Sequence, residues 1–349
     1  MRDAGRGARL GAFARTHEAR LLLAVVVLGV FLSLSTPSFL TLQNAVDLLT
    51  SNAFAGMLAA GLLVVLISGN IDISFTAIAS VAQYVAMTLA NAAWADRPEI
   101  GWLGVVAVSA GLGTLLGLLN AVLLKTLRLS SIIVTIATLN LFFGLLMFAS
   151  HGNEIFALPD WFVNGASWVV YTDAAKAEYT VNLQMIGLVA AFGMTALLLT
   201  RTNVGRQIYA LGSNADAAER VGVPVVRLTL LVYAYMGLIA GMASIVQAQN
   251  AQSVSPNALV GRELAVLAAV VLGGASLTGG VGTVLGTILG VTLLAFLENG
   301  LLLLGVSSYW SPFFTGAVIL IAVAVLAVEH RRRGPGRGPG RGPGRVKLA

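Results

Sequence analysis

The sequence predicts an all-α, polytopic membrane protein with about ten spans and with both ends of the chain on the cytoplasmic side. Of its 349 residues, 57% are hydrophobic and only 10% are charged, whereas a soluble domain carries about 25% charged residues. Long apolar runs recur along the chain, and the basic residues lie in the joints between them. A bilayer is therefore the expected solvent, and helices are the expected elements because they satisfy their own backbone hydrogen bonds there.

Ten apolar runs predict ten membrane-spanning helices within one transmembrane domain, which we place at residues 21–330. A helix needs about 20 apolar residues to cross about 30 Å of hydrocarbon. The predicted spans are 21–34, 45–67, 73–93, 100–124, 132–150, 181–200, 228–248, 262–277, 281–304 and 310–328.

Two of these runs are short. The run 21–34 follows five arginines, as the apolar part of a signal peptide does, but no clear cleavage site follows it. We therefore interpret it as an uncleaved first span. The run 262–277 ends in a glycine-rich stretch, and two interpretations stay open for it. It crosses the membrane, or it enters and returns on the same side.

Two basic segments flank the predicted membrane domain. Residues 1–20 form a basic cytoplasmic N-terminus, and residues 331–349 repeat Gly-Pro-Gly-Arg. The composition of the second segment cannot build a core and predicts a disordered tail. Its charge suits contact with anionic membrane lipid, although a solvated tail that follows the last span is the simpler interpretation.

The distribution of positive charge predicts the orientation of the chain. Lysine and arginine are retained on the cytoplasmic side during insertion. With the N-terminus inside, 18 of the 21 basic residues fall in inside segments, and only Arg97, Lys176 and Arg262 fall outside. An even number of spans with both termini in the cytoplasm is the topology that this partition predicts.

The composition excludes several classes of function. No cysteine is present, so the chain has no disulfide framework, thiolate metal site or iron–sulfur cluster. No Gly-Lys dipeptide occurs, so the phosphate loop of a nucleotide-hydrolysing subunit cannot form. The basic residues make no stripe of the kind that binds nucleic acid. We expect no catalytic residue, no cofactor, no metal and no nucleic-acid partner.

Ionisable residues are nearly absent from the predicted spans. Gradient-driven carriers usually place such residues there, where charge is costly and therefore functional. Here Asp47, Asp72, Glu263 and Glu298 lie at or near the ends of apolar runs. The pattern predicts a conduit that takes its energy from another protein.

The cytoplasmic loop 201–227 contains one predicted short helix. Ser213 or Asn214 caps its start, Gly222 closes it and Pro224 stops it. A helix of about eight residues is marginal in water and needs something to pack against. Docking to a partner protein and packing on the chain's own spans are equally good interpretations.

Four stretches, in order, resemble the permease family of ABC importers for ribose and other simple sugars. The resemblance covers about residues 45–328. The stretches are Gly-Asn-Ile-Asp-Ile-Ser at 69–74, Asn120 followed by Ile-Val-Thr-Ile-Ala-Thr-Leu at 133–139, Leu-Gly-Ser-Asn-Ala-Asp-Ala-Ala-Glu-Arg-Val-Gly-Val at 211–223, and Glu-Leu at 263–264 leading into Ala-Ala-Val-Val-Leu-Gly-Gly-Ala-Ser-Leu-Thr-Gly-Gly at 268–280. The chain departs from the family at Asn70, at Val281 and at 130–131, where glycine, arginine and paired prolines are common.

The resemblance implies a location and a set of partners. It implies a multi-pass protein of the bacterial inner membrane that pairs with a second permease subunit, identical or different. Its other implied partners are cytoplasmic ATP-binding subunits and an extracytoplasmic sugar-binding protein. In such systems the short cytoplasmic helix contacts the ATPase, and the residues that carry over to this contact are Asn214, Ala217, Ala218, Glu219 and Gly222.

A pathway for sugar should offer amides and hydroxyls in an otherwise apolar wall. The candidates are Asn120, Thr135, Thr138, Asn140 and Asn299. For each of them, a hydrogen bond to a neighbouring helix is the competing interpretation. Another set is predicted to break helices or to allow close packing, and it comprises Gly69, Asp72, Gly273, Gly274, Gly279 and Gly280.

Three functions follow from these observations. The first is the permease subunit of an ATP-driven importer of a simple sugar such as a pentose or deoxysugar. The second is a permease of the same fold for branched-chain amino acids or nucleosides. The third is a gradient-driven carrier, which the bare spans make the least favoured.

The charge partition predicts where a reporter enzyme is active. A reporter that works only in the cytoplasm should be active when fused after Arg128, Arg220 or Arg333, and inactive when fused near Lys176, because positive loops stay inside. Reporter activity in cells measures this directly. Activity at Lys176 would reverse the predicted orientation.

Overall fold

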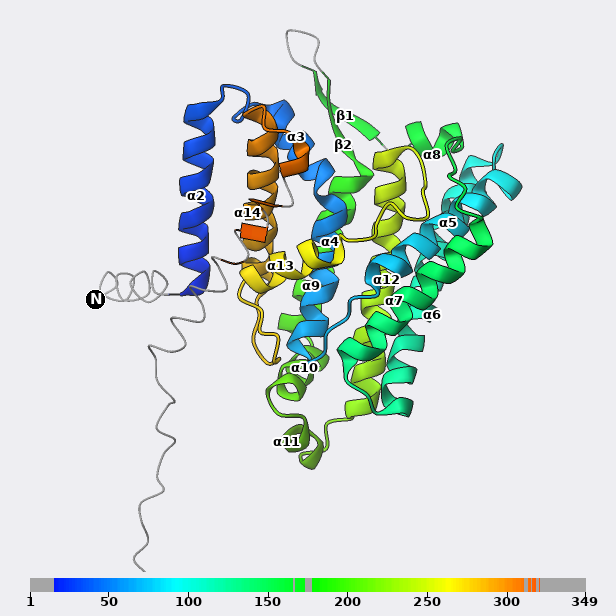
Figure 1. Cartoon of the computed structure of the whole chain (residues 1–349), viewed down its shortest axis with the longest axis vertical. Coiled ribbons are helices and arrows are strands. Elements are labelled where there is room, and N and C mark those ends of the chain that lie inside the picture. The colour runs from blue at the N-terminus through cyan, green and yellow to red at the C-terminus, as the bar shows by residue number, and fades with distance from the viewer. Residues whose placement is uncertain are drawn as a thin grey trace, which may run out of the picture.

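Helices make up nearly the whole of the described chain. The computed structural model describes residues 16–165, 167–172, 178–310, 313–314, 316–317 and 320. Its helices are α2 (His17–Ser35), α3 (Leu42–Ser51), α4 (Ala53–Ile67), α5 (Phe75–Ala93), α6 (Pro98–Leu127), α7 (Ser131–Ser150), α8 (Asp160–Asn164), α9 (Leu183–Arg201), α10 (Asn203–Ser213), α11 (Ala215–Arg220), α12 (Val225–Ala251), α13 (Glu263–Leu272), α14 (Val284–Leu303) and the 3-10 helix η1 (Ser308–Trp310). Figure 1 shows the long helices running side by side.

Seven helices of the described chain are long and apolar enough to cross a membrane: α2, α5, α6, α7, α9, α12 and α14. Each matches one of the ten predicted spans. The pair α3 and α4 makes an eighth candidate, but it is bent by 51°. The predicted span 310–328 lies, apart from a few residues, outside the described part of the chain, as do residues 1–15 and the tail 331–349.

The predicted span 45–67 is therefore a broken one. The backbone of Asn52 joins its two halves, and its amide group donates to the carbonyl of Leu48 at 3.0 Å. The break leaves α3 amphipathic, while α4 is apolar all round and is buried on every side except at Ala55. A helix that is apolar all round belongs in the centre of a bundle.

The predicted span 262–277 does not form a full crossing helix. Its helix α13 has only 10 residues, which gives a length of about 15 Å against the 30 Å of the hydrocarbon core. The chain then turns through its glycine-rich stretch and returns as α14, against which α13 packs. This geometry favours the interpretation that the segment enters and returns.

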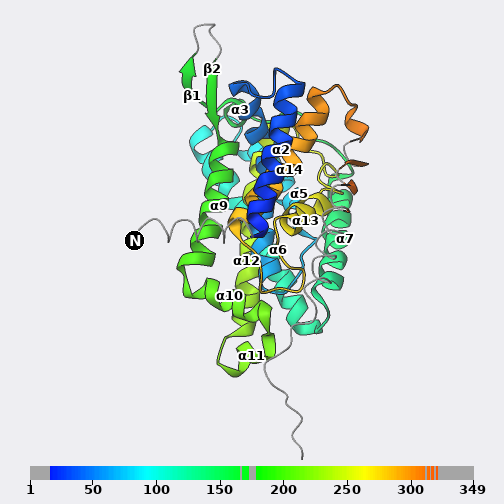
Figure 2. The same ribbon diagram turned by 90° about the vertical axis from the view of Figure 1, so that its left-hand side faces the viewer.

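A two-stranded hairpin interrupts the helical pattern between α8 and α9. Strand β1 (Ser167–Thr172) pairs antiparallel with β2 (Glu178–Asn182). The all-helical prediction did not include it. In Figures 1 and 2 the hairpin lies at the opposite end of the molecule from α11, and we call these two ends the hairpin end and the α11 end.

The loops of the described chain alternate between these two ends. The connection from α6 to α7, together with α10 and α11, lies at the α11 end, whereas α3, α8 and the start of α6 lie at the hairpin end (Figures 1 and 2). The two groups match the inside and outside groups of the charge partition. Which end faces the cytoplasm stays a prediction.

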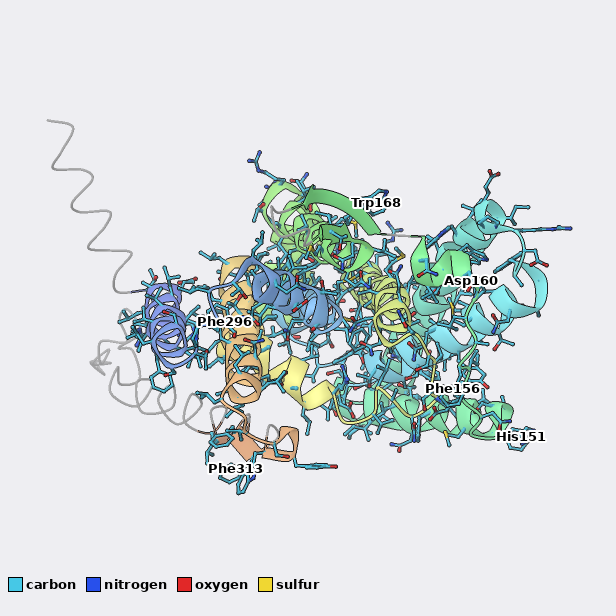
Figure 3. All side chains as sticks on the ribbon, turned by 90° about the horizontal axis from the view of Figure 1, so that it is seen from above. His151, Phe156, Asp160, Trp168, Phe296 and Phe313 are labelled. Carbon is cyan, nitrogen blue, oxygen red and sulfur yellow. The ribbon has the colours of Figure 1, made fainter. Side chains whose placement is uncertain are left out.

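Helix α2 lies at the edge of the bundle and packs against α14. Figure 3 looks down on the bundle from above and labels Phe296 of α14 beside α2. The ring of Phe296 meets that of Phe39 edge to face, with centroids 5.2 Å apart. At the other end of α2, Nε2 of His17 lies 2.9 Å from the carbonyl oxygen of Leu272. The first span is therefore fixed to the α13–α14 unit at both ends.

Helices α6 and α12 make the most extensive helix contact of the described chain. Gly113 and Gly117 on α6 face Gly237 and Gly241 on α12, each pair at the four-residue spacing of membrane helix interfaces. A Cβ added at Gly113 would collide with the carbonyl oxygen of Gly237, and one at Gly237 would collide with that of Gly113. Only glycine lets the two backbones approach this closely.

The α6–α12 contact predicts the effect of a matched pair of substitutions. Gly237→Leu should lower the free energy of unfolding by at least about 1–3 kcal/mol, because the new side chain must push the two backbones apart. Gly111→Leu, on the partner helix α6, should cost little, since nothing lies within 4 Å of a Cβ there. Thermal unfolding of the purified chain in detergent measures both. Equal melting temperatures would show that the contact is dispensable.

Candidate functional site

The predicted short helix is present as α11 and lies at the α11 end of the molecule. Asn214 is its N-cap, and the side-chain oxygen of Asn214 accepts from the backbone N–H of Ala217 at 2.9 Å. At the other end, Gly222 has a φ of +86°, which favours glycine, and its N–H donates to the carbonyl of Glu219 at 2.9 Å. The local sequence thus defines both ends of the helix.

The residues of α11 divide into an inner and an outer face. Ala218 is only 4% exposed and packs against the chain itself. Ala217 and Glu219 are exposed, and Val221, four residues after Ala217, is 80% exposed. Residues four apart share a helix face, so Ala217 and Val221 present a small apolar surface to the outside. The helix packs inward through Ala218, as one of the two interpretations predicts. Docking of its other face to a partner stays a prediction.

Helix α10 links α11 to the membrane helices through a cluster of glycines. We call Gly69, Gly212, Gly279 and Gly280 the glycine junction. A Cβ at Gly212 would collide with the carbonyl oxygen of Ile67, and one at Gly279 would lie 2.6 Å from the Cα of Gly69. The junction therefore brings together the end of α4, helix α10 and the turn between α13 and α14.

Two hydrogen bonds reinforce the glycine junction. The N–H of Gly280 donates to the carbonyl of Ile67 at 2.9 Å, and the Tyr209 hydroxyl of α10 donates to the carbonyl of Gly282 at 2.7 Å. Burial raises the pKa of Tyr209 above its ordinary value, so the phenol keeps the proton that it donates. The α10 segment is thus joined directly to the turn that precedes α14.

The remaining predicted packing glycines lie on the same turn. A Cβ at Gly273 would lie 2.5 Å from the carbonyl oxygen of Gly286 on α14. Gly274 lies against the ring of His17, which a Cβ there would approach to 2.7 Å. Both positions serve close packing, as the sequence predicts, and neither lies in a phosphate-binding loop.

Asp72 organises the irregular backbone between α4 and α5. One of its carboxylate oxygens accepts from the backbone N–H of Ser74 at 2.8 Å and from the Ser74 hydroxyl at 2.7 Å. The amide of Asn120 on α6 donates to the same hydroxyl at 2.6 Å. The other Asp72 oxygen and the Asn120 carbonyl oxygen have no partner within the described residues. The helix break predicted at Asp72 is therefore a buried polar turn held by α6.

Three of the predicted pathway residues lie near this turn or on the helix beside it. Thr135 of α7 donates to the carbonyl of Ser131 at 2.9 Å and lies 3.4 Å from that of Ile71, and Thr138 donates to the carbonyl of Thr135 at 3.3 Å. Asn140 is exposed and donates to the carbonyl of Ile136 in its own helix. Apart from the long contact of Thr135 with Ile71, their partners lie within α7 itself. These bonds are not the contacts with a neighbouring helix that the competing interpretation expects, and the role of the three residues in transport stays a prediction.

Asn299, the fifth predicted pathway residue, lies apart from the other four on α14. Its amide exchanges two hydrogen bonds with Asn44 of α3, at 2.8 and 3.2 Å. It lines a polar pocket of 520 Å³ between α3, α12 and α14. The sequence interpretation missed most of this pocket, including Gln247, Asn250 and Arg262. Their only signal in the sequence was a position near the end of an apolar run.

The family of the chain follows from comparison with known proteins. The family described as "Branched-chain amino acid transport system / permease component" matches residues 44–323, which is most of the chain. The chain belongs to this permease family. No solved structure matches it.

Curated relatives align over nearly the full length of the chain. The ribose import permease protein RbsC of Escherichia coli is 34% identical over 91% of this chain and 96% of its own length. The L-arabinose ABC transporter permease protein AraH of Azospirillum brasilense is 32% identical, covering 93% of this chain and 91% of its own. The autoinducer 2 import system permease protein LsrC of Photorhabdus luminescens is 30% identical, with 91% of each chain covered.

These comparisons confirm the resemblance that the four sequence stretches predict. The chain is a multi-pass membrane protein, homologous to bacterial inner-membrane permeases, and it is the non-catalytic transmembrane component of an ABC transporter. A binding-protein-dependent permease of this kind implies ATPase and binding-protein partners.

Proposed function

We propose that the chain is the membrane-spanning subunit of an ATP-driven importer for a simple sugar. The observation that carries this proposal is the alignment of nearly the whole chain with permeases named for ribose and L-arabinose. In this proposal a soluble sugar-binding protein delivers the sugar at the hairpin end. Two ATP-binding subunits act at the α11 end, and a second permease subunit completes the pathway.

The geometry of α11 supports a contact with an ATPase subunit. The helix projects from the α11 end, and its outer face offers Ala217 beside the exposed Val221. Small residues allow a partner surface to approach a helix closely. Asn214 and Gly222 fix the two ends of α11, Glu219 lies at its exposed edge, and Ala218 anchors it inward. These five residues together form the proposed coupling element.

The glycine junction supports a route from this contact to the spans. A displacement of α11 would move α10, and α10 cannot move without disturbing the end of α4 and the turn before α14, because their backbones are in contact. Closely packed elements transmit displacement in this way because interiors have few voids. The route reaches both the broken span α3–α4 and the short helix α13.

A second substrate class also finds support. The similarity to an autoinducer 2 permease is only slightly lower than that to the sugar permeases. The family description names branched-chain amino acids, but the similarity to permeases named for ribose and L-arabinose favours a sugar. Uptake of each class by the assembled transporter separates these substrates.

The proposal predicts that the isolated chain is inactive. Reconstituted alone in lipid vesicles, it should neither hydrolyse ATP nor accumulate ribose or arabinose under a proton or sodium gradient, because it has no phosphate loop and nearly bare spans. ATP hydrolysis and radiolabelled sugar uptake are the measurements. Gradient-driven uptake by the chain alone would make it a secondary carrier.

A substitution on the outer face of α11 should uncouple the transporter. Ala217→Glu places a charged side chain where a partner surface would approach, and it should lower sugar uptake by about tenfold or more while the chain is still inserted normally. Uptake in cells and ATPase stimulation by the loaded binding protein, measured in the reconstituted complex, should fall together.

The matched control for this experiment is Ala210→Glu. Ala210 is also an exposed alanine of the same loop, but it lies on α10 rather than on α11. A substitution at Ala218 would be a poorer test than Ala217→Glu, because Ala218 is buried and its substitution also disturbs packing. Normal uptake by the Ala217→Glu variant would remove α11 as the coupling element.

A further inference from the structure

The polar pocket between α3, α12 and α14 is a site that the proposed coupling mechanism does not use. It lies toward the hairpin end, where α3 is found. Its 520 Å³ falls within the range of about 300–1,000 Å³ that is typical of small-molecule sites. The volume alone therefore admits a small organic ligand.

The polar groups in this pocket come from four separate parts of the chain. Asp47 belongs to α3, Gln247 and Asn250 to α12, Arg262 to the start of α13, and Glu298 to α14. Pocket residues that come from different helices are far apart in the sequence. Only the fold gathers them around one space.

Several of these groups make no hydrogen bond within the protein. Among the described residues, the side chains of Gln247, Asn250, Arg262 and Glu298 make no hydrogen bond or salt bridge with the chain, and those of Asn250, Arg262 and Glu298 are exposed. The opposite charges of Arg262 and Glu298 attract each other. By contrast, the buried amide of Asn44 is fully engaged with Phe39 and Asn299. The donors and acceptors of these side chains are therefore accessible to an exchangeable partner, which is either water or a ligand.

The mixture of groups selects the chemistry of that ligand. A guanidinium only donates hydrogen bonds, a carboxylate only accepts them, and an amide does both. A matching ligand must therefore donate and accept at several points. An anion would face the carboxylates of Asp47 and Glu298, and a cation would face Arg262. A neutral molecule with several hydroxyl groups satisfies all three kinds of group without a like-charge contact. A zwitterionic amino acid would also do so, and the similarity to permeases named for ribose and L-arabinose is what favours the sugar.

The apolar part of the wall suits the same ligand. Leu48, Leu302 and Leu303 complete the lining and offer surface to the C–H face of a sugar ring. A lipid acyl chain would instead prefer the neighbouring groove of 530 Å³ between α9 and α14, which is lined almost wholly by apolar residues. The two spaces share Leu48 of α3 and Asn52, which joins α3 to α4, but they differ in chemistry.

The geometry points to a binding site for a neutral sugar within the permease itself, formed by Gln247, Asn250, Arg262 and Glu298. This inference rests on the proposed function and adds to it a place where the sugar pauses after it leaves the binding protein. The site lets the permease take part in substrate selection.

The absence of cysteine from the chain makes a direct test available. Ser51→Cys introduces one thiol into the pocket at the end of α3 with little change in size. Ser38→Cys, on the exposed connection between α2 and α3, is the matched control. Each variant is assembled with its ATPase and binding-protein partners in lipid vesicles. Modification by a charged maleimide is then timed with and without D-ribose or L-arabinose.

One of these sugars should protect the thiol in the pocket. At a concentration ten times its Kd, it should slow modification of the Ser51→Cys variant about tenfold and leave the Ser38→Cys variant unchanged. Adding Glu298→Gln or Asn250→Ala to the Ser51→Cys variant should raise the sugar concentration for half-protection by about tenfold, because each removes a hydrogen-bonding group.

Sugar uptake by the same vesicles separates the two proposals. Uptake without protection overturns the pocket and leaves the importer intact. Equal protection of both thiols reveals a general conformational change and also overturns the pocket. A Ser51→Cys thiol that is unreactive even without sugar shows that a second subunit covers the site, which overturns the inference as well. If neither sugar is taken up and neither protects the thiol, both the pocket and the proposed sugar importer are ruled out.

Discussion

Direct contact between backbones, made possible by glycine, is the constraint on which the rest of this structure depends. In a membrane the hydrophobic effect does not drive one helix against another, so packing and hydrogen bonds must do so. Helices α6 and α12 meet through Gly113, Gly117, Gly237 and Gly241. The glycine junction uses the same device between α10, the end of α4 and the turn before α14. Any larger side chain at these places would separate the elements.

Close packing also explains how the chain tolerates irregular backbone inside the bundle. Non-helical segments at membrane depth survive only where protein or water satisfies their polar groups. The segment between α4 and α5 meets this requirement through hydrogen bonds. Ser74 donates to Asp72, and Asn120 of α6 donates to Ser74. The break between α3 and α4 is supported by Asn52. Polar residues in these spans therefore have a structural task, whatever further role they have in transport.

The sequence predicted the features whose cause is local. Apolar runs located seven spans, and the cap at Asn214 and the glycine at 222 located α11, because each signal lies within a few residues of the element that it defines. The bend at Asn52 was missed because no glycine or proline stands there. The spacing of Gly113 and Gly117 was available in the sequence, but their partners on α12 were not. The polar pocket was missed because Gln247, Arg262 and Glu298 are brought together only by the fold, and the inward position of Ala218 was hidden for the same reason.

The short helix α13 joins two regions that have so far been described separately. Arg262, at its beginning, lines the polar pocket, and Gly273, at its end, opens the turn that contains Gly279 and Gly280 of the junction. A helix of 10 residues is about 15 Å long and stiff over that length. It therefore connects the glycine junction to the polar pocket through one short, stiff element. A displacement of α10 that tilted α13 would also shift Arg262 relative to α3 and α14.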